Sequence, residues 1–560
     1  MTNYQFTGGT ICAPATIPGT GAISIIRVSG KESLAIADKV IDTKGVPIAE
    51  TEGYRLRYGT VFEADGSVLD NVIVSVFRAP HSYTGENSVE ISCHASRFIV
   101  NKILELLVNA GARIAAPGEF TRRAFVNGKM DLAQAEAVAD VIASQSAASH
   151  RVAMNQLKGG FSSELKVLRE KLLTMTSLLE LELDFSEEDV EFASRKELGQ
   201  LVDDSLTHIG RLTASFSRGN AIKNGIPVAI VGATNTGKST LLNALLGEER
   251  AIVSDIAGTT RDTIEETLNI DGILFRFIDT AGIRETDETI EKIGIDRTFK
   301  KLGEAAVVLG MTDLSRGEAA VLEDADFILS KVNEMGGVKN DGTENDGSET
   351  GGASPAEMDG APLVETDGAS LAETGGTLLA ETGVASQHGH GDGQERKVVI
   401  LVNKCDVAGS FYKDDNGTGC GSGNDLGENM AEIGDNKNVN HDNNIVSLIE
   451  NKYDNCKVIP ISAKTGKGLS TLTKTLGEIG SEITGSTDET LVTNVRHYEA
   501  LVRAASALER VRAGLHIATL PPDLIAQDLR EALYHLGEIV GEITTDETLG
   551  NIFRKFCIGK

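Results

Sequence analysis

Hydrophobic and polar positions follow different patterns in the N-terminal part of the chain and in the rest. Short apolar runs at 22–28, 71–77 and 88–94 predict β-strands, and one helix is predicted near 97–110. A mixture of strands and helix over a segment of this length is typical of a compact α+β domain. We therefore predict an α+β domain over residues 1–125.

Two later stretches place apolar residues three or four positions apart, which is the spacing of an amphipathic helix. The first stretch covers 129–147 and 162–185, and the second covers 495–515 and 522–543. Because the two stretches resemble each other, we predict that they form one elongated helical domain. The segment between them is then a module inserted into that domain.

The intervening module alternates β-like and helical patterns. Buried strands are predicted at the start of 226–247 and within 273–282, 397–406 and 456–466. Alternation of this kind favours a parallel sheet covered by helices.

Two stretches interrupt the module, at about 334–395 and about 409–447. The first is rich in Gly, Glu, Asp, Thr and Ala without aromatic residues, and the second is rich in Gly, Asn and Asp. Such compositions cannot bury enough apolar surface to fold. We predict disordered insertions in surface loops, which long chains tolerate at little cost in stability.

Composition narrows the class of protein. The 560 residues carry a formal net charge of −29, and six scattered cysteines form no CxxC pair. The charge argues against non-specific coating of nucleic acid, so an RNA contact needs a local basic patch or a partner. The cysteine spacing argues against a disulfide framework and against a zinc site. No run of about 18 apolar residues and no targeting pattern is present, so a cytoplasmic protein without membrane contact is expected.

The clearest motif lies between the first predicted strand of the module and the helix that follows it. The sequence GATNTGKST at 232–240 matches G-x-x-x-x-G-K-[ST]. Gly232 and Gly237 allow backbone N–H groups to wrap phosphates, Lys238 brings a positive charge to the β- and γ-phosphates, and the Ser239 hydroxyl ligates magnesium. The pattern predicts a nucleoside triphosphate site.

Two further motifs, each after a predicted strand, select guanine. The carboxylate of Asp406, in NKCD, can accept from the ring N–H and the amino group of guanine, a donor pair that adenine lacks. The segment 462–464, SAK, would close over the base. DTAG at 279–282 and GTTRD at 258–262 complete the set, which resembles the Ras-like GTP-binding superclass. Ile283 stands where Ras-like proteins carry the glutamine that orients the attacking water, so hydrolysis needs another water-positioning group.

Longer motifs make the resemblance more specific. They are DTAGIRETDETIEKIGIDR from residue 279, APGEFTRRAFVNGKMDLAQAEAVADVI from 116, PHSYTGENSVEISCH from 80, IIRVSG from 25 and FCIGK from 556. Together they resemble the MnmE (TrmE) family of tRNA-modifying GTPases over nearly the whole chain except the two insertions.

The resemblance implies a multidomain α+β protein with an inserted Ras-like α/β G-domain. It implies a homodimer and a heterotetramer with an FAD-dependent, MnmG-like partner. The pair would add a carboxymethylaminomethyl or aminomethyl-type group to the wobble uridine of certain tRNAs, with formyl- or methylene-tetrahydrofolate as the one-carbon source. GTP hydrolysis would require K⁺ and Mg²⁺. The expected domains are a folate-binding and dimerisation domain at 1–125, helical parts at 126–222 and 488–560, and a G-domain at 223–487.

The resemblance also assigns residues. Ser239 and Thr260 would bind Mg²⁺, and Glu291 would position the attacking water, although an exposed helix carboxylate is the alternative for Glu291. The expected K⁺ ligands are Asn235, Ser254, Ile256 and Thr259. The full set of expected GTP contacts is Asn235, Thr236, Gly237, Lys238, Ser239, Thr240, Ser254, Asp255, Ile256, Ala257, Gly258, Thr259, Thr260, Asp279, Thr280, Ala281, Gly282, Asn403, Lys404, Asp406, Ser462, Ala463 and Lys464.

For folate, the matching residues are Arg27, Glu90, Lys129 and Lys560. A pterin edge suits Glu90, and the anionic glutamate tail of folate suits Arg27 or a lysine. An ordinary surface ion pair is the alternative. Cys557 is expected beside this pocket with a catalytic role, against the alternative of a thiol on a frayed end.

Two other functions compete with tRNA modification. A regulatory GTPase of ribosome assembly would share the nucleotide motifs, but the N-terminal motifs and CIGK argue against it. A folate-dependent one-carbon transferase with a vestigial G-domain would share the N-terminal motifs, but the intact GATNTGKST, DTAG and NKCD argue against that.

Overall fold

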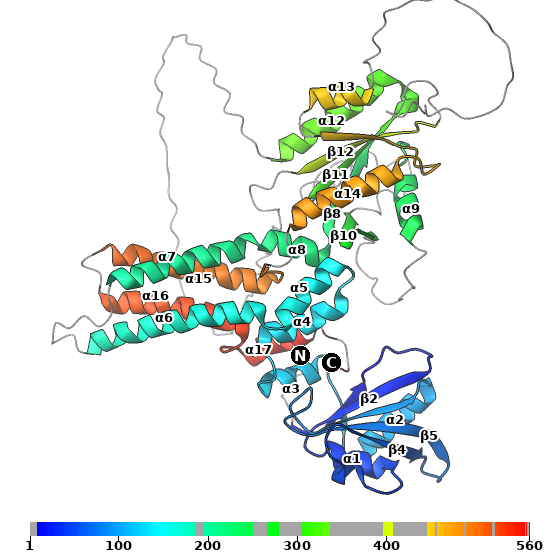
Figure 1. The fold of residues 1–560 in the computed structure, drawn as a ribbon, viewed down its shortest axis with the longest axis vertical. Helices are drawn as coiled ribbons and strands as arrows, with labels where there is room; N and C mark the ends of the chain where they lie inside the picture. The colour runs from blue at the N-terminus through cyan, green and yellow to red at the C-terminus, as the bar shows by residue number, and fades with distance from the viewer. Residues whose placement is uncertain are drawn as a thin grey trace, which may run out of the picture. The chain divides into compact units, whose positions relative to one another are not determined.

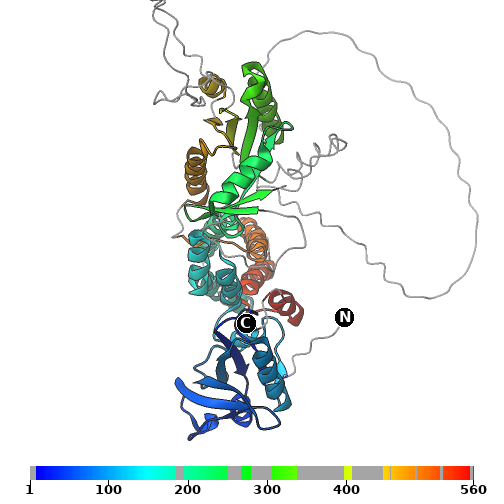
Figure 2. The same ribbon diagram turned by 90° about the vertical axis from the view of Figure 1, so that its right-hand side faces the viewer.

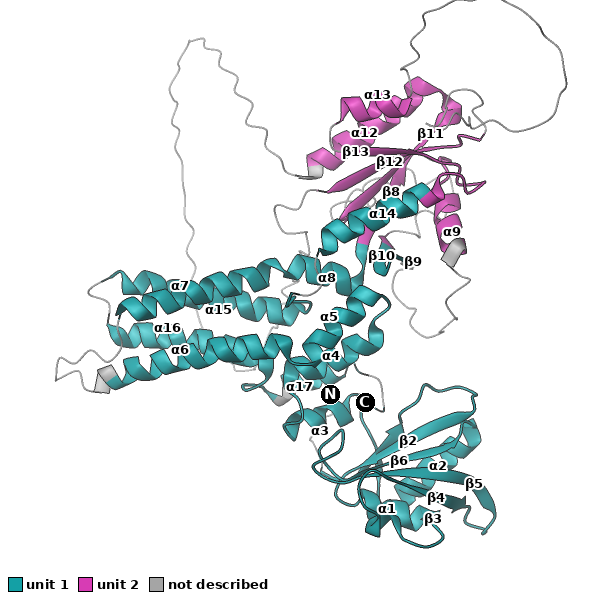
Figure 3. Ribbon diagram, viewed as in Figure 1, with its two compact units in different colours: residues 1–226, 267–276, 471–560 teal, residues 227–266, 277–470 magenta. Residues whose placement is uncertain are grey.

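The structure is a computed structural model of the whole chain. It describes residues 8–184, 195–249, 266–278, 305–336, 396–406, 445–453, 456–485, 489–517, 521–554, 556 and 559. The chain divides into two compact units, of which unit 1 comprises 1–226, 267–276 and 471–560, and unit 2 comprises 227–266 and 277–470 (Figure 3). Each unit is described by itself.

The N-terminal part of unit 1 is a seven-stranded sheet with two helices packed on one face (Figure 1). The strand order is β3-β4-β5-β6-β2-β1-β7, antiparallel except for the parallel pair β1 and β7. The predicted strands and the helix near 97–110 are confirmed. The bounds are β1 Ile11–Pro14, β2 Ile23–Ser29, α1 Ser33–Val40, β3 Ile41–Asp42, a 3₁₀ turn Ile48–Glu50, β4 Arg55–Phe62, β5 Val68–Phe77, β6 Ser88–His94, α2 Arg97–Asn109 and β7 Arg113–Ile114.

Alternation of side chains along the strands gives this sheet two unlike faces. On β5, Val72, Val74 and Val76 are buried in the core with the helices, whereas Ile73 is 47% exposed. The second face of the sheet therefore lies open in the described part of the chain.

The rest of unit 1 is mainly helical. Helix α6 packs on α16 and helix α7 on α15, around a core that includes Leu172, Leu508 and Leu529 (Figure 1 and Figure 2). The predicted association of the two helical stretches is thus present. The bounds are α3 Glu119–Val126, α4 Leu132–Ala143, α5 Ala147–Leu157, α6 Gly160–Asp184, α7 Arg195–Ala214, α8 Phe216–Asn224, α15 Val495–Leu515, α16 Pro522–Val540 and α17 Asp546–Phe553.

A six-stranded sheet has the order β13-β12-β11-β8-β10-β9. Its pairs β8 with β11, β11 with β12 and β12 with β13 are parallel, as the alternating pattern predicts. Strand β11 and helix α12 were not among the predicted elements. The bounds are β8 Ile226–Gly232, α9 Lys238–Glu249, β9 Glu266–Ile270, β10 Ile273–Ile278, β11 Val307–Asp313, a 3₁₀ turn Leu314–Arg316, α12 Glu318–Gly336, β12 Lys397–Asn403, α13 Ile445–Lys452, β13 Cys456–Pro460 and α14 Leu469–Thr484.

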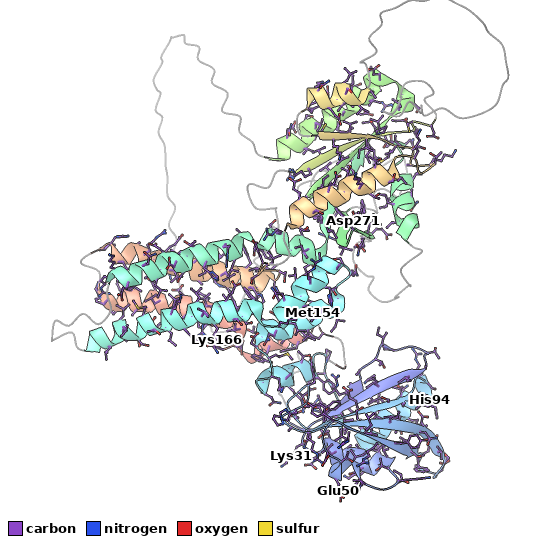
Figure 4. All side chains as sticks on the ribbon, viewed as in Figure 1. Lys31, Glu50, His94, Met154, Lys166 and Asp271 are labelled. Carbon is purple, nitrogen blue, oxygen red and sulfur yellow. The ribbon has the colours of Figure 1, made fainter. Side chains whose placement is uncertain are left out.

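The turn between β9 and β10 is bound to the helical part of unit 1. Asn269 Nδ2 donates to the carbonyl of Gln145, and the Ala148 amide donates to the carbonyl of Gly272. Asp271, labelled in Figure 4, lies in this turn with a left-handed φ of 52°. The turn is thus seated at the start of α5.

The predicted insertions are each slightly too long at one end. Helix α12 continues to Gly336 and α13 begins at Ile445, so 334–336 and 445–447 are helical. Apolar residues explain the difference, because Val332 and Ile445 are buried. The rest of the two predicted insertions, 337–395 and 409–444, lies outside the described residues. In the described part of the chain, no helix combines the length and the apolar character needed to cross a membrane.

Candidate functional site: a phosphate loop and a cross-strand ion pair

The loop 232–237 joins β8 to the first residue of α9. Its two predicted glycines have positive φ angles, 152° at Gly232 and 100° at Gly237. A Cβ atom at Gly232 would lie 2.3 Å from the carbonyl oxygen of Met311, and one at Gly237 would lie 2.4 Å from Asn403 Nδ2. Only glycine fits at either position. The loop therefore holds its backbone around the N-terminus of a 12-residue helix, an arrangement that suits an anion.

Lys238 brings the charge of the loop. Its ammonium donates to the carbonyls of Gly232 and Ala233, at 2.9 and 2.8 Å. Burial lowers the pKa of Lys238. The cation thus lies over the loop backbone, where the motif predicts the phosphates, and the residues present fit a nucleoside triphosphate.

Asn403, at the end of β12, links the two predicted halves of the nucleotide site. Its Nδ2 donates to the carbonyl of Thr236 at 2.7 Å, and its Oδ1 accepts from the Ala463 amide at 3.0 Å. The side chain is 3% exposed. A buried amide with both ends satisfied joins the phosphate loop to the 462–464 loop, a contact that sequence analysis did not identify.

Lys404 has a left-handed φ of 64° and donates from Nζ to Asp313 Oδ2 at 2.6 Å. Burial alone would raise the pKa of Asp313, but the hydrogen bonds from Lys404 and Ser315 outweigh it and hold that pKa below its usual range. The pair fixes the backbone just before Asp406. Asp406 is half-buried, Ser462 and Ala463 are buried, and Lys464 is exposed.

The structure therefore brings together the described members of the predicted nucleotide site, from Asn235 to Thr240, Asn403 to Asp406 and Ser462 to Lys464. Asn235 has a left-handed φ of 61° and an exposed side chain. The other predicted residues lie outside the described part of the chain. They are Ser254, Asp255, Ile256, Ala257, Gly258, Thr259, Thr260, Asp279, Thr280, Ala281, Gly282 and Glu291.

Arg27 and Glu90, two predicted folate residues, are cross-strand partners on β2 and β6. Arg27 Nε donates to Glu90 Oε1 at 2.9 Å, and the side chains are 19% and 25% exposed. The guanidinium lies over the rings of Tyr83 and Phe120, at 5.1 and 5.6 Å from their centres. The two rings lie in motifs that had no assigned role, and they give the ion pair an aromatic wall.

The loop 79–87 connects this ion pair with Lys129. Lys129 Nζ donates to the carbonyl of Pro80 at 3.1 Å. Glu86 accepts from Arg123 Nη1 at 2.9 Å and from the Ser29 hydroxyl at 2.8 Å. Glu86 and Arg123, which belong to two of the longer sequence motifs, therefore hold the loop 79–87 in place through these bonds.

The C-terminal residues lie against the same domain. A Cβ atom at Gly118 would lie 3.1 Å from Phe556 Cβ, and one at Gly559 would lie 2.0 Å from the carbonyl of Pro14. Pro14 adjoins Ala13, the strand partner of Arg27. Cys557 and Lys560, predicted at this pocket, lie outside the described residues.

Comparison with known proteins covers almost the whole chain. The family model described as "GTP-binding protein TrmE N-terminus" matches residues 10–129, and that described as "MnmE helical domain" matches residues 132–557. The chain is 44% identical over 554 residues to the tRNA modification GTPase MnmE of Parabacteroides distasonis, covering 98% of this chain and 100% of the relative. It is 43% identical to that of Bacteroides thetaiotaomicron, covering 98% and 99%, and 42% identical to that of Porphyromonas gingivalis, covering 100% and 99%.

Proposed function

The chain belongs to the MnmE family of tRNA modification GTPases, and we propose that its GTP hydrolysis requires potassium and serves wobble-uridine modification with an FAD-dependent, MnmG-like partner. The group added would be of the carboxymethylaminomethyl or aminomethyl type, with a tetrahydrofolate one-carbon unit as its source. The observation that carries the proposal is the Asn403 amide, which joins the phosphate loop to the predicted guanine loop.

GTP would be bound from three sides. The loop 232–237 and Lys238 would hold the phosphates, and Asp406 would accept from the guanine edge. The left-handed backbone of Lys404 and its bond to Asp313 support this role, because they restrain the segment that carries Asp406. The G-domain would comprise 223–487, inserted between helical parts at 126–222 and 488–560.

Two cations would complete the nucleotide site. Ser239, the second residue of α9, would ligate Mg²⁺ with Thr260, and Asn235 would ligate K⁺ with Ser254, Ile256 and Thr259. The exposed Asn235, on the phosphate loop itself, supports this assignment. A bound monovalent cation would supply positive charge next to the phosphates, where the charge of the transition state develops. Glu291 would position the attacking water.

Folate would bind at Arg27, Glu90, Lys129 and Lys560. The support is the ion pair of Arg27 and Glu90, which lies against Tyr83 and Phe120 rather than in open solvent. Burial raises the pKa of Tyr83, so its hydroxyl stays a neutral hydrogen-bonding group at the pocket. A flat pterin ring suits aromatic walls and a carboxylate edge. Cys557 would act beside this pocket.

A homodimer is supported by the open face of the N-terminal sheet. Leu56, Tyr58 and Ile73 lie on neighbouring strands, with Tyr58 directly opposite Ile73, and their exposed fractions are 66%, 67% and 47%. Ile23 on β2 is 66% exposed. Clustered apolar side chains of this kind mark a binding surface, and a second copy would cover it. The dimer would join two partner subunits as a heterotetramer in the cytoplasm.

The test is nucleoside analysis of tRNA from a strain that lacks this protein. We expect the modified wobble uridine to be absent and to return when the native chain is supplied, but not when N403A is supplied. Normal wobble modification in the deletion strain, together with a ribosome assembly defect, would show that the ribosome-assembly alternative is right.

The cation assignment has its own test, in GTP hydrolysis by the purified full chain. Hydrolysis should be faster in K⁺ than in Na⁺ at equal ionic strength, and N235A should remove the difference. Equal rates of the native chain in the two salts would reject the role of Asn235 without affecting the role in tRNA.

A further inference from the structure

A buried ion pair in the helical part of unit 1 takes no part in the sites proposed above. Glu136, on α4, accepts from Arg496 Nε at 3.1 Å and from Arg496 Nη2 at 2.9 Å. The Nε2 atom of His497 lies 2.7 Å from Glu136 Oε2. The side chains of Glu136 and His497 are 11% and 2% exposed. Burying charges has a high desolvation cost, and such pairs often contribute specific geometry rather than net stability.

The ion pair fixes the C-terminal end of α16. Arg496, at the start of α15, also donates from Nη1 to the carbonyl of Glu538 at 2.7 Å and from Nη2 to that of Ile539 at 3.1 Å. These carbonyls belong to the last turn of α16, where backbone acceptors have no partner within the helix. Arg496 therefore caps α16 while Glu136 holds its guanidinium in place.

The chain leaves α16 through Gly541, which has a left-handed φ of 85°. A Cβ atom there would lie 2.7 Å from Leu132 Cβ and 2.8 Å from the ring of Phe125. Gly541 therefore packs closely against Leu132 at the start of α4, and Leu132 lies one helical turn before Glu136. The direction in which the chain leaves α16 depends on how α4, α15 and α16 meet.

The segment that follows returns to the same helix. Leu549 and Phe553 of α17 and the following Phe556 pack with Leu132 and Ala135 of α4. Beyond them, Phe556 lies against Gly118, and Gly559 lies against Pro14 next to the strand partner of Arg27. Contacts among the described residues therefore link Glu136 and Arg496 to Phe556 and Gly559, which lie close to the strand that carries Arg27.

We propose that Glu136 and Arg496 are positioning residues that set the direction in which the chain leaves α16. They thereby hold α17, Phe556 and Gly559 in place against α4 and the N-terminal domain. That the C-terminal residues serve one-carbon chemistry rests on the proposed function. That Glu136 and Arg496 position them does not rest on it.

The test is hydrogen exchange of the full chain in E136Q and R496K, followed by mass spectrometry. The amides of Leu549, Arg554 and Phe556 are hydrogen-bonded in the native structure. Both variants should speed exchange of peptides that cover 546–556 by about tenfold, the effect expected on losing a hydrogen bond to a charged group. Exchange in α6, α7 and the middle of α15 should stay close to native.

A matched control lies on the same helix. Asp140 has an exposed fraction of 17% and pairs at 2.8 Å with Lys223, which lies on α8 rather than on α15 or α16. D140N therefore removes a comparable charge from α4 and should leave exchange at 546–556 unchanged. Unchanged exchange there in E136Q, or equal losses over α6, α7 and α15, would overturn the proposal. So would a loss in D140N as large as that in E136Q.

The same variants separate this inference from the proposed function. E136Q should lower wobble modification while GTP hydrolysis stays near native. Faster exchange at 546–556 with full modification would reject the role of the C-terminal residues in the chemistry and leave the positioning confirmed. Absence of wobble modification by the native chain would reject the proposed function alone.

Discussion

Asn403 is bound to the phosphate loop by a 2.7 Å hydrogen bond from its Nδ2 to the carbonyl oxygen of Thr236. Its other amide atom accepts from the backbone of Ala463. One buried side chain therefore sets the spacing between the predicted phosphate and guanine loops, and a loss of this amide would disturb both.

N403A should weaken GTP binding by about tenfold or more, because it leaves the buried Thr236 carbonyl and Ala463 amide without a partner. Titration with a fluorescent GTP analogue measures the change. N451A, at an exposed position on α13 in the same unit, is the control and should bind GTP normally. Native affinity in N403A would show that the amide has no part in binding.

Two glycines of the same strand–loop–helix segment should respond oppositely to alanine. G237A would place Cβ 2.4 Å from Asn403 Nδ2 at a φ of 100°, so we expect GTP binding to be lost. G247A meets no atom within 4 Å inside α9, and it should raise the free energy of unfolding by about 1 kcal/mol because alanine favours the helix. GTP titration and thermal unfolding of both variants are the measurements. Equal GTP affinity of G237A and G247A would contradict the prediction.

E90Q should reduce tetrahydrofolate binding by about tenfold, because a neutral amide neither pairs with a pterin donor edge nor holds Arg27 as a carboxylate does. Isothermal titration with a stable folate analogue measures it. E52Q changes an 80% exposed carboxylate that lies 3.6 Å from Arg55, and it should bind the analogue as the native chain does. If E90Q also binds normally, the Arg27–Glu90 pair is a surface ion pair and not a ligand site.

Charges on the open sheet face should separate the proposed dimer. The double variant Y58E/I73E puts two like charges on directly opposed residues, and sedimentation velocity should show monomers at concentrations where the native chain is dimeric. F327E, which charges a side chain 54% exposed on α12, is the control. A persistent Y58E/I73E dimer would place the interface elsewhere.

The native chain and the variant E136Q should differ in free energy of unfolding by an amount that depends on pH. Burial alone would raise the pKa of Glu136, but His497 and Arg496 outweigh burial and lower that pKa from 4.5 to about 2. A carboxylate with a lowered folded pKa stabilises the fold above its unfolded pKa, and the contribution is lost as the pH falls toward the folded value. The native chain should therefore exceed E136Q in free energy of unfolding by about 3 kcal/mol at pH 7.

The window for this effect follows from the same values. The difference should shrink as the pH falls from 4.5 toward about 2. Chemical denaturation of both proteins across this range is the measurement, with D140N as a control for removing a charge from α4. A difference that grows as the pH falls would contradict the prediction.

Local patterns were enough to predict much of the architecture. The strands of the N-terminal sheet and the helix at 97–109 follow from side-chain periodicity, because one face of each is buried. The parallel strands β8 and β12 follow from continuous apolar runs, because both of their faces are buried. The same patterns misplaced the start of the first insertion and the end of the second. Composition changes gradually there, whereas helices α12 and α13 extend as far as residues such as Val332 and Ile445 are buried.

The sequence by itself determined the prediction of a nucleotide site, because the spacing of Gly232, Gly237 and Lys238, and the position of Asp406 after a strand, are local properties. Only the tertiary structure decided how these residues are held. The bond from Asn403 to Thr236 joins positions 167 apart, and that from Arg496 to Glu136 joins positions 360 apart. No periodicity relates residues so distant, and their side chains meet because the packed helices and strands bring them together.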